Sequence, residues 1–452
     1  MASSKKRPSA ELPAKLADFL SRHVTPGQTL TLGLSGGLDS CVLLHLLAGA
    51  RDTFPFRLQA RHVHHGLSPH ADAWAAFCAD RCVALEVGFE VAQVSVSRDG
   101  GRGIEAAARA LRYQALLAAD GDAVVLAHHR DDQAETLLLQ LLRGAGVKGL
   151  AGMGAVSASS PEQRAGSRVW LRPLLEVPRS QLLAYAQAHG LRWIEDESNL
   201  DLAYDRNFLR HRVFPALEQR FPACRATLAR SAGHLAEAAE LLDEVAAQDA
   251  ACWVHQGRLK VAGLRAMSQA RGKNLLRYWL GSRLPEAPNA RRLQEIYRQL
   301  LEAGAEAQLR VALDGATVRR YRGEAWLELP EALPGKAILH WQGQAEWRAG
   351  GGLLHFKPVT GRGLALRHLE GMPLTVQPRC GGERFQPDCR RPARSLRHCF
   401  QESGIPAWQR DSLPLIYLGE TLAWVAGLGV ACPLQAAPAE PGLEISWQPD
   451  VI

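Results

Sequence analysis

The sequence predicts an α/β protein that begins with an open parallel sheet carrying helices on both faces. Strand-like and helix-like segments alternate over about the first 215 residues, which is the pattern of parallel βαβ units. From residue 223 the pattern changes to helices rich in Ala, Leu and Arg, and then to short strands and turns. We therefore expect three domains: the α/β domain at 1–222, a mainly helical domain at 223–332 and a small α+β domain at 353–452.

Composition places the chain among ordinary globular proteins. Its 452 residues are too many for one core, and 47% hydrophobic with 22% charged residues is a normal balance. The net charge of +7 gives a mild bias toward polyanionic partners. No run approaches the ~18 apolar residues of a membrane helix, and the N-terminus lacks the apolar core of a signal peptide, so we expect no membrane association and a cytoplasmic location. The nine cysteines form no CxxC pair and suggest neither a disulfide framework nor a zinc ribbon.

The α/β elements follow from their apolar patterns. The first strand is expected at 29–34 and a helix with apolar residues at 41–47, joined by a strand-to-helix turn. The next elements are strands within 56–66, 89–97 and 123–129 and helices at 71–85, 103–119 and 131–144. The segment 156–168 has the composition of an exposed loop, and segments within 169–198 complete the domain. Ligands of such sheets lie beyond the C-terminal strand ends, so the first turn, His64-His65-Gly66 and His128-His129 should converge.

The second half of the chain is organised differently. We expect helices at 225–248, 268–280 and 289–304 and strands at 309–313 and 324–329. A Pro/Gly-containing linker at 332–352 leads to short strands and turns, which include an arginine-rich segment at 379–404.

The turn after the first strand reads SGGLDS, residues 35–40. The hydroxyls of Ser35 and Ser40 and the N–H groups of Gly36, Gly37 and Leu38 can donate hydrogen bonds to phosphate. Asp39 beside so much negative charge implies a bound Mg²⁺. The hexapeptide resembles the pyrophosphate loop of ATP pyrophosphatases, which split ATP between the α and β phosphates.

Other kinds of glycine turn fit less well. The loop has no lysine, as a Walker A loop requires, and no GxGxxG. Gly33, Ser35 and Gly37 match GxSxG, so a hydrolase with His128 or His129 as base stays formally open. A plain glycine turn with a serine cap is the remaining alternative.

Three further groups carry candidate chemistry. Asp131, Asp132 and Glu135 line the start of a helix, where negative charge is also favourable for purely structural reasons. Glu105, Arg109, Arg112 and Tyr113 recur at helical spacing, although a surface ion pair would explain Glu105 and Arg109. Arg206, Asn207 and Arg210 follow an acidic turn, and paired arginines suit phosphate as well as solvent.

Taken together, five stretches resemble the tRNA(Ile)-lysidine synthetase family, within the PP-loop superfamily. They are SGGLDS, HVHHGLS, GIEAAARALRY, HHRDDQAETLLLQLLRGAGVKGLAGM and WIEDESN followed by YDRNFLR. The C-terminal GIPAWQRDSLPLIYLGETLAWVAGLGV extends the resemblance over the whole chain. One departure is the arginine-rich CRRPARSLRHC, where a more lysine-rich segment is expected.

The resemblance implies a ligase that joins free L-lysine to C2 of the wobble cytidine of an isoleucine tRNA with a CAU anticodon. ATP adenylates the base, pyrophosphate leaves, and lysine then displaces AMP to form lysidine. It implies ATP and Mg²⁺ at residues 35–40, with Asp39 on the metal, and Asp39, His129, Asp132 and Glu135 as catalytic candidates. Arg109, Arg112, Arg206, Asn207 and Arg210 are then expected to contact nucleotide, lysine or tRNA.

The C-terminal arginines are expected to bind tRNA phosphates. They are Arg379, Arg384, Arg390, Arg391, Arg394 and Arg397. Two rival interpretations remain, namely another ATP pyrophosphatase such as a tRNA thiolase or an amide-forming synthetase, and a non-catalytic RNA-binding protein. A homodimer is left open.

Overall fold

The computed structural model describes residues 8–66, 68–95, 104–158, 168–284, 287–304, 309–329, 337–339, 341–348, 352–369 and 372–449. The chain divides into two compact units, the first formed by Met1–Cys252 with Gln269–Leu293 and the second by Trp253–Ser268 with Gln294–Ile452. Within the described part, no helix is both long and apolar enough to cross a membrane. The predicted boundaries at 222, 332 and 353 stay a prediction.

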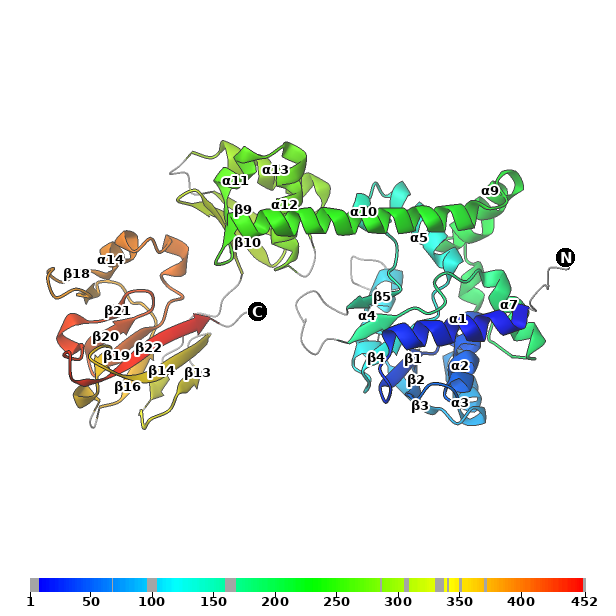
Figure 1. Ribbon diagram of the computed structural model, residues 1–452, viewed down its shortest axis with the longest axis horizontal. Coiled ribbons are helices and arrows are strands. Elements are labelled where there is room, and N and C mark those ends of the chain that lie inside the picture. The colour runs from blue at the N-terminus through cyan, green and yellow to red at the C-terminus, as the bar shows by residue number, and fades with distance from the viewer. Residues whose placement is uncertain are drawn as a thin grey trace. The chain divides into compact units, whose positions relative to one another are not determined.

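The first unit is built on a six-stranded sheet in the order β3-β2-β1-β4-β6-β5 (Figure 1). Its strands are β1 (Thr29–Gly33), β2 (Arg57–His64), β3 (Gly88–Gln93), β4 (Ala123–Val125), β5 (Val156–Ala158) and β6 (Val169–Leu171). The first five in spatial order are parallel, and β5 alone is antiparallel. The strand order reverses direction at β1, so the crevice between the C-terminal ends of β1 and β4 is the expected ligand position.

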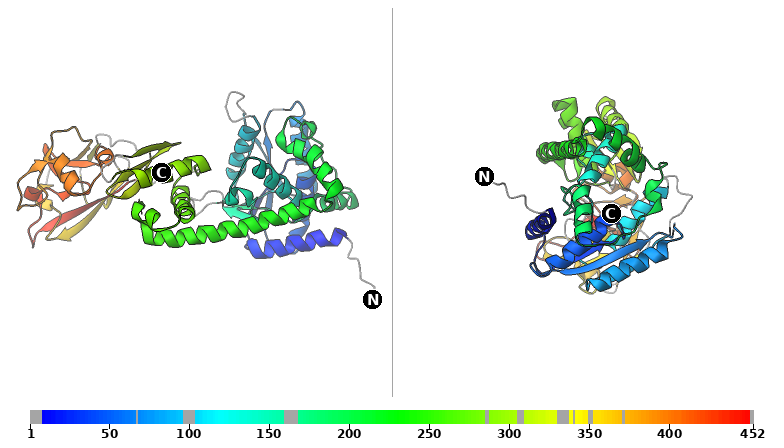
Figure 2. Two further views of the ribbon diagram at one scale, coloured as in Figure 1. Left: turned by 90° about the horizontal axis from the view of Figure 1, so that it is seen from above. Right: turned by 90° about the vertical axis from the view of Figure 1, so that its right-hand side faces the viewer.

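The helices of the first unit confirm the alternating pattern. They are α1 (Pro8–His23), α2 (Leu38–Ala50), α3 (Ala71–Ala84), α4 (Ile104–Leu117), α5 (Arg130–Leu142), α6 (Val147–Leu150), α7 (Arg179–Ala188), α8 (Asp205–Phe208), α9 (Phe214–Arg220), α10 (Cys224–Trp253) and α12 (Gln269–Gly281). A short 3₁₀ turn, η1 (Glu197–Leu200), and a π-helical turn, η2 (Leu209–Val213), flank α8. Figure 2 shows α10 as one uninterrupted helix.

The two faces of the sheet are covered by different helices, and successive side chains of β4 point alternately to one face and the other. Ala123 and Val125 belong to the core that contains the apolar residues of α1, α2, α3 and α7. Val124 points the other way and packs with Leu116 of α4. Because α2 lies in the larger core, its apolar residues are buried almost all round rather than along one stripe.

One predicted loop is partly wrong. The segment 156–168 begins with the strand β5, which pairs with β6. Residues 159–167 of that segment lie outside the described residues. The alternation in β5 is only three residues long, too short for a periodicity argument to detect.

The second unit begins with a five-stranded antiparallel sheet in the order β7-β8-β11-β10-β9. Its elements are β7 (Val254–His255), β8 (Arg258–Lys260), α11 (Val261–Ala266), β9 (Arg310–Leu313), β10 (Ala316–Tyr321) and β11 (Glu324–Glu328), and α13 (Ala290–Glu302) carries the boundary between the units. α13 and the strands at 310–313 and 324–328 agree with the prediction, whereas α11, β7, β8 and β10 were not predicted.

Tight hairpins explain the strands that the prediction missed. Gln256-Gly257 and Arg322-Gly323 both take positive φ values, at +48° and +80° and at +49° and +79°. Two successive residues with positive φ are what a two-residue hairpin requires. Such a turn joins β7 to β8 and β10 to β11 with two residues each, so strands of two to six residues pair without a longer loop.

The remainder of the second unit consists of two further antiparallel sheets and a small hairpin. One sheet has the order β12-β16-β19-β20-β21, with bounds Ala337–Leu339, Leu374–Gln377, Leu415–Leu418, Thr421–Val425 and Gly429–Val430. The other has the order β13-β14-β22-β15, with bounds Glu346–Arg348, Gly352–Thr360, Pro441–Pro449 and Leu364–Ala365. The hairpin pairs β17 (Arg384–Phe385) with β18 (Arg394–Ser395), which leads into α14 (Leu396–Glu402); short 3₁₀ turns η3, η4 and η5 lie at Leu366–His368, Ala407–Gln409 and Cys432–Leu434.

The predicted linker at 332–352 carries structure of its own. β12 pairs with β16, and β13 pairs with β14, so both strands belong to the C-terminal sheets. The proline and glycine residues around these strands indicated a linker, but β12 pairs with a strand distant in sequence and β13 pairs with the next strand along the chain.

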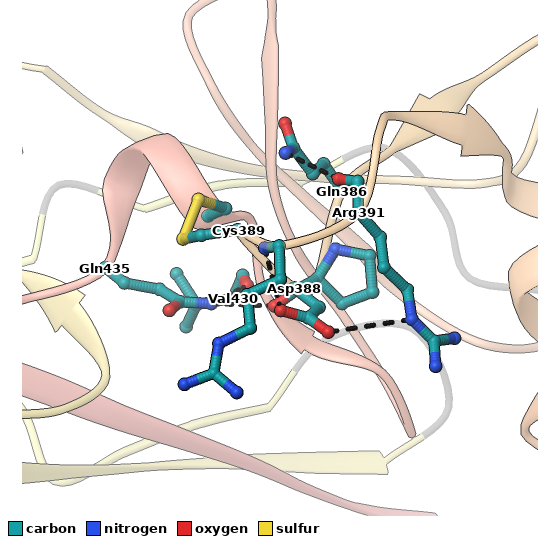
Figure 3. The surroundings of a disulfide bond; sticks show 9 residues. Gln386, Asp388, Cys389, Arg391, Val430 and Gln435 are labelled. Atoms are coloured by element: carbon teal, nitrogen blue, oxygen red, sulfur yellow. Dashed lines mark hydrogen bonds and ion pairs between the residues drawn. A yellow bond between two sulfur atoms is a disulfide. The ribbon is translucent and has the colours of Figure 1, made fainter.

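A disulfide joins Cys389, in the loop between β17 and β18, to Cys432 at the start of η5 (Figure 3). The Cα atoms are 5.2 Å apart and the two residues are 43 positions apart in the sequence. Beside it, the Cys432 N–H donates to the Gln386 carbonyl at 2.7 Å and the Gln435 side chain to the Pro387 carbonyl at 3.0 Å. The absence of a CxxC spacing had argued against a disulfide framework, and this long-range pair is a correction, because spacing shows only local pairs.

We expect that Cys432→Ser lowers the free energy of unfolding of this C-terminal region by about 2–4 kcal/mol, since the bond restricts the unfolded chain. Urea unfolding with and without dithiothreitol measures the effect. Dithiothreitol should shift the wild type toward the variant and leave the variant unchanged. Equal midpoints for wild type and variant under oxidising conditions would contradict the prediction.

Candidate active site

The SGGLDS loop joins β1 to α2 at the point where the strand order reverses. The Ser35 and Ser40 hydroxyls lie 3.1 Å apart, and Ser40 donates to the Gly37 carbonyl at 3.0 Å. Gly37 is the N-cap of α2, and none of the described side chains caps this helix. The first N–H groups of α2 are therefore available to an anion, and the positive end of the helix faces the same place.

The two glycines of the loop have different roles. Gly36 has a φ of +84°, and an added Cβ would lie 2.6 Å from the Ile194 side chain, so only glycine fits there. Gly37 has an ordinary φ of −74°, so its backbone conformation does not require glycine. Around Gly37 the nearest atom to an added Cβ is the Ser35 hydroxyl at 3.5 Å. A side chain at Gly37 would thus occupy open space where a ligand can approach the backbone.

Asp39 is the second residue of α2 and is loosely held. Its Oδ2 lies 3.5 Å from Nε2 of His129, and its Oδ1 lies 3.9 Å from Nε of Arg179. Oδ1 is buried and has no hydrogen-bond partner. A buried carboxylate oxygen without a partner costs free energy, so Asp39 is suited to an additional positive ligand.

The predicted carboxylates and arginines form one cluster. We call Asp132, Glu135, Arg206 and Arg210 the carboxylate–arginine cluster. Glu135 is only 1% exposed and accepts from Arg206 Nε at 2.9 Å and from Arg210 Nε at 2.8 Å. Asp132 accepts from Arg206 at 2.8 Å. Both arginines thus point at carboxylates of α5, which lowers the positive charge they offer to phosphate.

The cluster and the loop are linked through His129. The His129 ring accepts from the Asp132 N–H at 3.4 Å, and the Asp132 side chain accepts from the His129 N–H at 2.9 Å, as in a capping box. Burial lowers the pKa of His129, but the hydrogen bond to Asp39 and the charge of Asp132 outweigh it, so its pKa is raised. Burial raises the pKa of Asp132, but His129 and Arg206 outweigh that effect and the pKa is lowered.

The predicted convergence of histidines is confirmed in part. His62 lies 2.9 Å from the Leu34 carbonyl, next to the loop, whereas His64 pairs with Asp72 at 3.0 Å. His65 accepts from Arg112 Nε at 3.4 Å, and burial, followed by the charge of Arg112, lowers the pKa of His65 to about 4. Sequence reasoning did not single out His62, because it precedes the strand end.

A second basic group surrounds His128. Burial, together with the charges of Arg172, Arg206 and Arg109, lowers the pKa of His128 to about 4 against the opposing charge of Asp132. Arg109 donates to the Tyr113 hydroxyl at 3.2 Å. Arg172 donates to the Gly154 carbonyl at 2.8 Å. His128 is therefore neutral at physiological pH, and its buried Nδ1 has no hydrogen-bond partner.

Two of the predicted residues, Asn207 and Glu105, are not among those that the contacts of the described residues bring to the loop or the carboxylate–arginine cluster. The Asn207 side chain donates to the Asp201 carbonyl at 3.0 Å. The side chain of Glu105 lies outside the described residues, so the proposed pair with Arg109 stays a prediction.

Sequence reasoning missed three arginines of the site: Arg172, Arg179 and Arg225. Arg225 donates to Glu218 at 2.6 Å and lies 3.7 Å from Glu135. Arg179 is the first residue of α7. A basic residue at a helix N-terminus opposes the helix dipole, and this was the signal in the sequence that could have identified Arg179.

Of the C-terminal arginines, Arg384 lies on β17, Arg394 on β18 and Arg397 on α14, whereas Arg390 and Arg391 lie in the loop between β17 and β18 and Arg379 precedes β17. Arg384, Arg390, Arg391 and Arg397 are exposed, and Arg394 is half-buried. Arg391 and Arg394 pair with Glu402, and Arg379 pairs with Asp411 at 3.2 Å. The Cys389–Cys432 disulfide fixes the loop that carries Arg390 and Arg391 (Figure 3).

Comparison with known proteins covers nearly the whole chain. The PP-loop domain family matches residues 8–217, the TilS substrate binding domain matches 259–326 and the TilS substrate C-terminal domain matches 374–447. The chain is 43% identical over 456 residues to a protein of Nitrosomonas europaea named tRNA(Ile)-lysidine synthase, covering 100% of this chain and 99% of that protein. It is 46% identical over 445 residues to a protein of the same name from Ralstonia nicotianae, covering 94% and 93%.

We expect Glu135→Gln to destabilise the first unit by about 3 kcal/mol, because it leaves Arg206 and Arg210 partly uncompensated. Urea unfolding checks this value. As a control, Asp243→Asn removes an exposed ion pair with Lys148 and should cost about 1 kcal/mol or less. A loss for Glu135→Gln no larger than that of the control would argue against the cluster as a structural constraint.

Proposed function

Because the chain belongs to the tRNA(Ile)-lysidine synthase family, which are ATP-dependent ligases, we propose that it joins free lysine to C2 of the wobble cytidine of an isoleucine tRNA with a CAU anticodon. The observation that carries the proposal is the SGGLDS loop at the strand-order reversal, with uncapped N–H donors and Asp39 beside His129. Sequence identity of 43% and 46% to two relatives, over more than nine tenths of each chain, supports lysidine formation over the other reactions of ATP pyrophosphatases.

The first step is adenylation of the tRNA base. The C2 oxygen of the cytosine attacks the α phosphorus of ATP, the bond to the bridging oxygen breaks, and pyrophosphate leaves. The N–H groups of Gly37 and Leu38 and the hydroxyls of Ser35 and Ser40 would bind the departing pyrophosphate. Stabilising that charge is the main contribution of the loop. The attack converts a poor leaving oxygen on C2 into AMP.

Asp39 fits a magnesium ion. Among the described residues no group of three or more His, Cys, Asp or Glu side chains could hold a metal by itself. Mg²⁺ bound to nucleotide commonly takes only one or two protein carboxylates beside phosphates and water. The partnerless Oδ1 of Asp39 offers one such ligand. When bound, the ion would neutralise phosphate charge.

In the second step the ε-amine of lysine attacks C2, and the bond from C2 to the AMP oxygen breaks. The amine must lose a proton, and His129, Asp132 and Glu135 were the candidate bases. The lowered pKa of Asp132 makes its carboxylate a weaker proton acceptor than an ordinary aspartate. Both ring nitrogens of His129 are engaged, Nδ1 by the Asp132 N–H and Nε2 by Asp39. Glu135 is enclosed by two arginines. We propose that His129 holds Asp39 in place through Nε2 and that Asp132 and Glu135 orient Arg206 and Arg210.

The structure weakens the case for a thiolase. Cys41 and Cys78 both lie near Gly36: the Cys41 thiol is 3.2 Å from the Gly36 carbonyl. Burial raises the pKa of each thiol to about 12. A thiol with so high a pKa is protonated at neutral pH and is a weak nucleophile.

Incubation with ATP, Mg²⁺, labelled lysine and bulk tRNA, followed by nucleoside analysis, tests the function. Label should enter one cytidine-derived nucleoside, and Asp39→Ala should lower the rate about 100-fold or more. Release of AMP without lysine incorporation would contradict the lysine reaction and indicate another ATP pyrophosphatase.

We propose that the C-terminal arginines hold the tRNA backbone. Replacing Arg390, Arg391 and Arg397 by Gln should weaken binding of all tRNAs, whatever their sequence. The slope of log Kd against log salt concentration should fall by about one for each phosphate contact that is lost. Filter binding over a salt series measures this. The affinity of the variant for ATP should stay unchanged. If the variant binds tRNA as tightly as the wild type, these arginines are not part of the tRNA-binding surface.

A further inference from the structure

Arg179 is a basic side chain in direct contact with the loop. It begins α7, and its Nε lies 3.9 Å from Oδ1 of Asp39. Among the described lysines and arginines, it is the one whose ion pair reaches residues 35–40 directly. Its side chain is 47% exposed, so it is accessible to a ligand in the site.

The contact with Asp39 is loose. No hydrogen bond joins the two side chains, and Oδ1 of Asp39 is buried without a hydrogen-bond partner. A pair at this separation, with a half-exposed arginine, contributes about 0–1 kcal/mol. Stability alone therefore gives little reason for an arginine at this position.

The backbone around Arg179 also favours an anion. Because Arg179 starts α7 and Asp39 is in the first turn of α2, the N-terminal ends of both helices lie near the loop. Both ends carry partial positive charge. The Arg179 backbone N–H donates to the Asp131 carboxylate at 3.4 Å, and its guanidinium separately faces Asp39.

Arg179 differs in this respect from the predicted arginines. Arg206 and Arg210 are held by carboxylates at 2.8 to 2.9 Å, and each is about a quarter exposed. Moving either toward a phosphate would leave a buried carboxylate without its partner, which is costly. Arg179 can leave Asp39 without breaking a hydrogen bond, because its Nε lies 3.9 Å from Oδ1 of Asp39 and that oxygen already has no hydrogen-bond partner.

We propose that Arg179 is a phosphate-positioning residue that binds the β and γ phosphates of ATP and stabilises pyrophosphate as it leaves. The part of this inference that concerns pyrophosphate release rests on the proposed function, whereas the part that concerns ATP binding can be tested without lysine or tRNA. The guanidinium can donate two parallel hydrogen bonds to phosphate oxygens, which a lysine cannot. It therefore acts on the nucleotide and not on the lysine substrate.

Arg179→Gln and Arg179→Lys test the role, with Arg22→Gln as control. Arg22 lies on α1 and pairs with Asp18 on the surface. We expect Arg179→Gln to lower kcat/KM for ATP about 100-fold, with the KM for lysine and the urea midpoint unchanged. Arg179→Lys should recover part of the loss, and Arg22→Gln should behave as wild type.

Equilibrium binding of MgATP to the full chain, without lysine or tRNA, separates this inference from the proposed function. If the wild type binds ATP and Arg179→Gln binds it much more weakly, the role of Arg179 stands even when no lysidine forms. Unchanged ATP binding and unchanged kcat/KM for ATP in a folded Arg179→Gln variant would overturn it. So would a loss confined to the KM for lysine.

Discussion

The first unit depends on the neutralisation of a buried carboxylate. Glu135 is only 1% exposed, and an unpaired charge at that depth would cost several kcal/mol. Arg206 and Arg210 supply the compensation from a segment about seventy residues later. This requirement holds α8 and η2 against α5, where Ala134, Leu209 and Phe214 form a small apolar core. The start of α10 packs on the same core through Leu228, so the first turns of the long helix contact the region that the ion pairs hold together.

The loop is held from the opposite side by backbone contacts. The Ile194 N–H donates to the Gly36 carbonyl at 2.9 Å, and the Ile194 side chain fills the space that a Cβ on Gly36 would need. A segment late in the α/β domain therefore sets the shape of the turn after the first strand. The donors of α2 are preorganised before any nucleotide arrives, which is the condition under which electrostatic stabilisation is effective.

Charge is distributed unevenly over this site. His65 and His128 are neutral because burial and neighbouring arginines lower their pKa values to about 4. His129, one residue further along, has a raised pKa because it faces Asp39 and Asp132. The pKa values of two adjacent histidines are thus shifted in opposite directions. Their position at the end of β4 was predictable, but the difference between them depends on which carboxylates each ring meets.

The sequence by itself determined the parallel α/β sheet, the position of the loop and the residue types of the site. Strand and helix periodicity, glycine positions and the SGGLDS hexapeptide are local properties, so they can be recognised without coordinates. Only the tertiary structure decided that Arg206 and Arg210 face carboxylates, that Arg179 reaches Asp39, that short hairpins complete the middle sheet and that Cys389 meets Cys432. These contacts join residues far apart in the chain, and local patterns carry no information on which distant partner a charged, sulfur or backbone group will meet.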